Sequence, residues 1–155
     1  MTARIRITSR LPLESRPALE ALLFFNARQH HVRDAIEDSI ARYGLPEIIE
    51  DGNSLRVTLA ALPGVQCLYA VRQDSPAPRP VGVVIYARDS VERFTVVHVG
   101  VAEDGVLGGS AVATQVLLRL LQEIRRVARR TTGIRHVALA YRQSRASRAG
   151  LAAIA

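Results

Sequence analysis

The chain contains no lysine, and this absence excludes one class of phosphate site. All 21 basic residues are arginine, whereas a P-loop needs the lysine of its Gly-Lys-Ser/Thr ending. Tryptophan is also absent, and aromatic residues make up only 5% of the sequence. Stacking surfaces for single-stranded nucleic acid are therefore scarce, and recognition of that kind is poorly supported.

Cysteine and long apolar runs are equally scarce. Cys67 is the single cysteine, so an internal disulfide is excluded, as is typical of a reducing compartment. Lacking a paired motif, Cys67 is expected to be a small core residue and not a nucleophile. The longest apolar stretches, such as residues 21–25, fall far short of the roughly 20 residues that span a bilayer, and the first ten residues contain no signal-peptide segment. We therefore expect a soluble, cytoplasmic protein without membrane association.

The chain has the size and composition of one globular domain over residues 1–155, with 48% hydrophobic residues. Its charge is uneven. Residues 110–155 hold nine arginines against the single acidic residue Glu123, whereas acidic residues slightly outnumber arginines before position 110. This distribution places positive potential where an anionic ligand could bind, although a solvated helix face would look similar.

The first third of the sequence predicts a strand followed by helix. Residues 4–11 alternate apolar and basic side chains, which is typical of a strand. Ser15 is a preferred N-cap for a following helix, with Pro17 in its first turn. A second apolar stripe over residues 32–43 predicts another helix, or the continuation of a kinked one, that ends at Gly44.

The middle of the chain predicts β-structure. Residues 54–60 and 65–73 flank a Leu-Pro-Gly turn, so we expect them to form a hairpin. Residues 74–80 are proline-rich and predict an exposed connection. Residues 81–88 and 93–102 then complete four successive strands, whose simplest arrangement is an antiparallel meander.

From Ser110 the apolar spacing changes to that of a long amphipathic helix, with arginines on its outer face and a stop near Gly133. Residues 135–141 predict a last strand. A strand, a glycine-bearing turn and a helix thus follow one another directly. Backbone N–H groups at such a helix start attract anions, and phosphates above all.

This order of elements resembles the GNAT superfamily of acyltransferases. The sequence VVHVGVAEDGVLGGSAVATQVLL over residues 96–118 is similar to that family's central strand, turn and helix. The resemblance implies a GNAT-like α/β (α+β) fold, with a mixed, mostly antiparallel sheet flanked by helices on both faces. It also implies acyl-coenzyme A-dependent N-acyltransfer, with acetyl-coenzyme A as the expected substrate and a small amine or protein amine as acceptor.

The resemblance also implies roles for particular residues. The pyrophosphate of coenzyme A would lie on backbone N–H groups of the turn, and the oxyanion of the reaction on N–H groups near Val99 and Val101. His98 would be the general base, since an imidazole titrates near neutral pH. Strand alternation places His98 on the same face as Phe94, Val96 and Gly100. This placement fits equally well with a half-buried core histidine that has no catalytic role. The turn residues are Leu107, Gly108, Gly109, Ser110 and Ala111.

Other readings stay open. Gly105 stands where the family usually has Arg or Gln, and no tyrosine follows the last strand in the family's position, so a degenerate domain that binds coenzyme A or a protein without catalysis is one alternative. A basic nucleic-acid-binding domain is another, less favoured one. No metal site is expected. On a helix, only one of His30 and His31 can lie on the same face as Asp34, and no further ligand follows at a suitable spacing. The open edge of the last strand predicts a homodimer.

Overall fold

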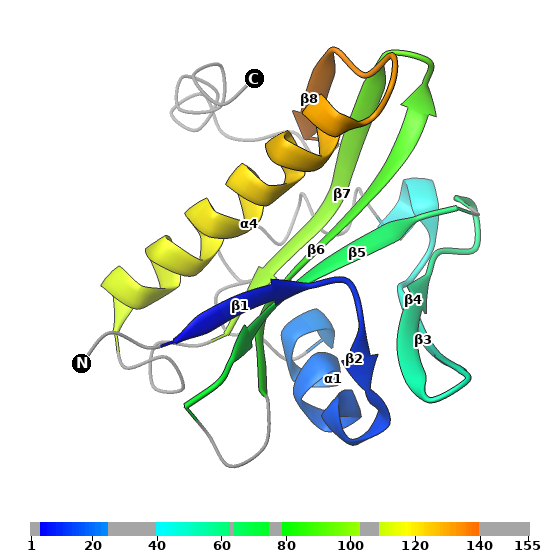
Figure 1. Cartoon of the computed structure of the whole chain (residues 1–155). Coiled ribbons are helices and arrows are strands. Elements are labelled where there is room, and N and C mark those ends of the chain that lie inside the picture. Colours follow the sequence, from blue (N-terminus) through cyan, green and yellow to red (C-terminus); the bar gives the residue numbers. More distant parts are fainter. Residues whose placement is uncertain (1–3, 25–39, 63, 75–78, 103–108, 140–155) are drawn as a thin grey trace.

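The larger of two sheets contains five strands in the order β1-β5-β6-β7-β8 (Figure 1). The computed structural model describes residues 4–24, 40–62, 64–74, 79–102 and 109–139. Neighbouring strands of this sheet are antiparallel, except that β7 and β8 are parallel. The strands are Ile5–Thr8 (β1), Gln66–Arg72 (β5), Arg79–Ser90 (β6), Arg93–Val101 (β7) and His136–Leu139 (β8).

The smaller sheet has three strands in the order β2-β4-β3 and was not expected from the sequence. They are Leu11–Pro12 (β2), Glu47–Asp51 (β3) and Ser54–Thr58 (β4). The predicted hairpin between residues 54–60 and 65–73 is wrong, because β4 pairs with β3 and β2, whereas β5 belongs to the larger sheet. Only β5, β6 and β7 form the expected meander.

Two helices are complete in the described residues: α1 (Arg16–Phe24), preceded by the 3-10 turn η1 (Leu13–Ser15), and α4 (Ser110–Arg130). Pro17 lies in the first turn of α1 as expected. Ser15, however, ends η1, and its buried Oγ has no hydrogen-bond partner in the described residues, so the predicted N-cap is wrong. The helix end at Gly44 is confirmed: its N–H donates to the Ile40 carbonyl at 2.9 Å, and its φ is +90°.

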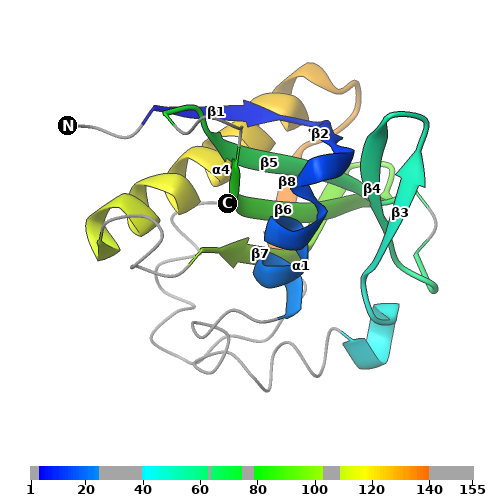
Figure 2. The ribbon, with the colours of Figure 1, turned by 90° about the horizontal axis from the view of Figure 1, so that it is seen from below.

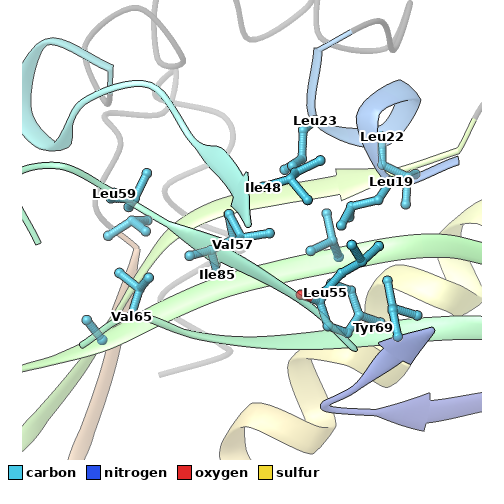
Figure 3. Close-up of a cluster of buried hydrophobic side chains, with 14 of the residues drawn as sticks. Leu19, Leu22, Leu23, Ile48, Leu55, Val57, Leu59, Val65, Tyr69 and Ile85 are labelled. Carbon is cyan, nitrogen blue, oxygen red and sulfur yellow. The ribbon is translucent and has the colours of Figure 1, made fainter. Parts of the chain in front are cut away.

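The two faces of the larger sheet are covered by different elements. Helix α1 and the smaller sheet pack on one face, where Leu19, Val57 and Ile85 belong to one buried cluster (Figure 3). Helix α4 covers the opposite face through a second cluster that includes Val116 and Leu120 (Figure 2). A mixed, mostly antiparallel sheet with helices on both faces is thus confirmed. No helix in the described part of the chain is long and apolar enough to cross a membrane.

Two leucines of α4 test this packing, because they lie two residues apart and face opposite ways. Leu120 is fully buried, whereas Leu118 is 49% exposed. We expect Leu120→Ala to lower the free energy of unfolding by about 2–5 kcal/mol, through lost burial and the cavity left behind. Leu118→Ala should cost roughly 0.5 kcal/mol or less. Urea unfolding of both variants measures the difference, and equal losses would mean that α4 presents another face to the sheet.

Candidate functional site

A β-bulge in β7 decides which way the candidate base points. Ile85 pairs with His98, but the next residue of β6, Tyr86, pairs with Val96, so Val97 is an extra residue in β7. The extra residue reverses the alternation of side chains between the two halves of the strand. Val96 faces α4, whereas His98 faces α1 together with Val97 and Ile85.

The prediction that His98 shares a face with Phe94 and Val96 is therefore wrong, although Gly100 does lie on its side. Simple alternation assigns successive strand residues to opposite faces of the sheet. A bulge inserts one extra residue and so reverses this assignment for the residues that follow it. The sequence gives only a weak indication of the bulge, the adjacent valines Val96 and Val97. Both are buried in the structure.

His98 is buried without a hydrogen-bond partner for one ring nitrogen. Its side chain is 7% exposed, and Nε2 has no partner in the described residues. Burial alone lowers the pKa of His98 to about 4. The imidazole is consequently neutral at physiological pH, and one of its ring nitrogens is buried without a partner in the described residues.

Gly100 provides close backbone packing next to this imidazole. A Cβ at position 100 would lie 2.9 Å from the Leu22 carbonyl oxygen of α1 and 3.5 Å from His98 Nε2. Any larger side chain would therefore press α1 away from β7, since the nearer neighbour is backbone. The glycine brings the end of α1, β7 and the His98 ring together.

The edge of β7 that faces away from β6 pairs with β8 from Arg93↔His136 to Val96↔Leu139, where the described part of β8 ends. β7 itself continues to Val101. The Ala102 N–H donates to the Val81 carbonyl of β6 at 2.8 Å. Because backbone groups alternate between the two edges of a strand in such a pair, the Val99 N–H points away from β6.

Helix α4 begins without a side-chain cap. Gly109 is its N-cap residue with a φ of +140°, and a Cβ there would meet nothing within 4 Å, so backbone conformation rather than space requires glycine. The first intrahelical bond is from the Ala113 N–H to the Gly109 carbonyl. The N–H groups of Ser110 and Ala111 precede it, and the first turn contains no acidic residue.

The start of α4 lies near the end of β7. Gly82 of β6 pairs with Val101, and a Cβ at Gly82 would lie 2.8 Å from Val116 Cγ1 and 2.9 Å from Leu120 Cδ1. The helix therefore crosses this end of the sheet at close range. Ser110 is six residues before Val116, which is about 9 Å along the helix axis.

Two predicted site residues, Leu107 and Gly108 of the turn, lie outside the described residues. The same holds for Gly105, which departs from the family's turn pattern, and for His30, His31 and Asp34, which were not expected to bind a metal. In the parts of the chain that the structure describes, no group of three or more His, Cys, Asp or Glu residues is placed to hold a metal ion.

Cys67 is half-buried, and its thiol is protonated. Burial raises its pKa to about 11, against the smaller opposing effects of Tyr69, the Val57 N–H and the Arg56 charge. A thiol of this kind is a poor nucleophile at neutral pH. This supports the expectation that Cys67 has no nucleophilic role.

The burial of His98 has a measurable consequence for stability. Its folded-state pKa of about 4 lies below the ordinary value of 6.5, so the unfolded chain binds more protons between these pH values. Stability should thus fall as the pH decreases through this window, with His98 accounting for about 2 kcal/mol at roughly pH 5. His98→Gln stays neutral and should lose less stability on acidification. Urea unfolding at several pH values measures this, and identical pH profiles for both proteins would contradict it.

Comparisons with known proteins find a distant likeness in structure. No family model matches the sequence, and no curated protein matches it. Among solved structures, the chain is similar to a protein from Desulfovibrio desulfuricans that is assigned to the GNAT family of acetyltransferases. The two are 15% identical with a TM-score of 0.43, over 97% of this chain and 84% of that chain. A likeness of this size establishes neither the family nor the activity of this chain.

Proposed function

We propose that this protein is an acyl-coenzyme A-dependent N-acyltransferase, with an acetyl group as the expected cargo. One observation carries the proposal: the start of α4, which has no side-chain cap and no acidic residue in its first turn, lies near the part of β7 where the Val99 N–H points away from β6. This arrangement offers two sets of backbone donors near one end of the sheet. An extended ligand that ends in a phosphate group suits both sets.

The first set of donors would serve the thioester. The Val99 N–H, which points away from β6, would hold the pantetheine arm and the oxyanion that develops when an amine attacks the carbonyl. A part for Val101 is only what the sequence resemblance implies. Donors fixed in a strand need little reorganisation during the reaction. The new C–N bond forms as the C–S bond breaks, and coenzyme A leaves as the thiol.

The second set of donors would serve the pyrophosphate. Gly109, Ser110 and Ala111 supply N–H groups at the positive end of the helix dipole. Leu107 and Gly108 would complete the loop, as the sequence pattern implies. The absence of an acidic side chain in the first turn favours an anion at this position.

His98 would accept the proton that the attacking amine loses, directly or through a water molecule. Its Nε2 is unpaired in the described residues, and its low pKa keeps it neutral before the reaction. The same low pKa makes it a weak base. This favours a second candidate, a domain that binds coenzyme A without transferring its acyl group.

A charge placed in the first turn of α4 tests the pyrophosphate site. Ala111 is exposed, so Ala111→Glu should stabilise the helix by about 0.3–1 kcal/mol through its dipole. It should also weaken acetyl-coenzyme A binding by about tenfold through repulsion. Calorimetry and thermal unfolding measure the two effects, with Ala111→Gln as the uncharged control. Wild-type protein that binds no acetyl-coenzyme A would refute both candidates.

His98→Ala separates the two candidate functions. If His98 accepts the proton, the variant should bind acetyl-coenzyme A normally but lose about 100-fold or more in kcat with an amine acceptor. Acyl transfer is measured as released thiol. Equal rates in wild type and variant would remove His98 from the mechanism, and binding without transfer in the wild type would favour the non-catalytic domain.

A further inference from the structure

A second candidate site lies far from the β7–α4 region, at the opposite edge of the larger sheet. A cleft of about 530 Å³ opens between β4 and β5. This volume falls in the range of pockets that hold small molecules, roughly 300–1,000 Å³. Its floor and walls come from both sheets, and the link between β1 and β2 closes one end.

The cleft exists because two strand pairs, β1 with β5 and β2 with β4, are only partly paired along their lengths. β1 pairs with β5 only from Tyr69 to Arg72, and β2 pairs with β4 only at Leu11↔Leu55 and Pro12↔Ser54. The first three residues of β5 and the last three of β4 therefore have no strand partner on their facing edges in the described chain. The Val57 N–H of β4 donates a hydrogen bond to the Cys67 sulfur of β5.

The lining of the cleft has an excess of positive charge. Arg10 and Arg56 line it together with a single acidic residue, Asp51. Neither guanidinium forms an ion pair within the described residues, unlike Arg72, which binds Asp74 at 2.6 Å. Both arginines are exposed to solvent.

Neutral polar groups complete the lining. Tyr86 donates a hydrogen bond from its hydroxyl to Gln66 Oε1 at 3.0 Å. This bond leaves the amide N–H groups of Gln66 as further donors on the cleft wall. Two guanidinium groups and an amide are the donors that carboxylate and phosphate oxygens prefer, and each guanidinium can bind such a group through two hydrogen bonds.

We propose that this cleft binds a small organic anion through a carboxylate or phosphate group held by Arg10 and Arg56. The site is separate from the β7–α4 region. Cys67, Ile85 and His98 lie in register on three adjacent strands, which places the cleft edge about 10 Å from His98. The fully buried Ile85 stands between them, so an occupant of the cleft does not reach His98.

Cys67 offers a direct test, because it lines the cleft and is the only cysteine in the chain. The rate of its alkylation by iodoacetamide is measured at about pH 9, where more of the thiol is ionised than at neutral pH, with succinate, with inorganic phosphate and with chloride at matched ionic strength. An anion at ten times its Kd should slow alkylation about tenfold, since only the unoccupied cleft reacts. The measurement needs no coenzyme A, so its result is independent of the proposed acyltransfer.

The variant Arg10→Gln/Arg56→Gln should lose this protection, whereas Arg129→Gln, an exposed change on α4, should retain it. Arg56→Lys keeps the charge without the planar fork and should protect only weakly. Protection by succinate alone would identify a carboxylate ligand, and protection by phosphate alone a phosphate ligand. No protection by either anion, or equal protection in the double variant, would overturn the proposal.

Discussion

The bulge at Val97 is the constraint on which the arrangement of β7 depends. β7 packs against α4 with its first half and against α1 with its second half. A regular strand would carry its alternation straight through and place His98 on the α4 side. One extra residue places Val97 and His98 on the same face, toward α1, at the cost of one local break in the hydrogen-bond ladder.

The parallel pairing of β7 with β8 imposes a second constraint. Two parallel neighbours require a crossover that covers one face of the sheet. Helix α4 is this crossover, and its 21 residues span about 31 Å. Its length carries the chain from one end of β7 back to the other, so that its N-terminus lies near the end of β7. The position of the uncapped helix start thus follows from topology before any ligand is considered.

Much of the fold follows from local patterns. The apolar stripe of α4 needed no knowledge of the partner surface, because 21 residues of constant spacing fix a helix and its buried face. The smaller sheet could not be foreseen in the same way. β3 contains the acidic residues Glu47, Glu50 and Asp51, which conceal its strand character, while β4 and β5 both alternate and are separated by a turn-like sequence. Nothing local distinguishes a hairpin from two strands of different sheets.

The candidate site was predicted in outline but not in detail. The β7–α4 junction was visible because a glycine-bearing turn between a strand and a helix is a local feature. The burial of His98 was not, since it depends on the bulge and on the close approach of Leu22 to Gly100. The cleft at β5 was equally hidden, because Arg10, Asp51 and Arg56 come from separate segments that only the tertiary fold brings together.

Several of the arginines that the structure describes beyond position 110 have structural roles. Arg119 donates to the Ile5 carbonyl at 2.7 Å and so ties α4 to β1. Arg129 and Arg130 occupy the last turn of α4, where cations stabilise the negative end of the helix dipole. Arg135 pairs with Glu92 at 3.7 Å. The charge asymmetry therefore does not by itself locate an anion site. If an anion binds in the β7–α4 region, the uncapped backbone at the start of α4 is what would hold it, at the end of the helix farthest from its terminal arginines.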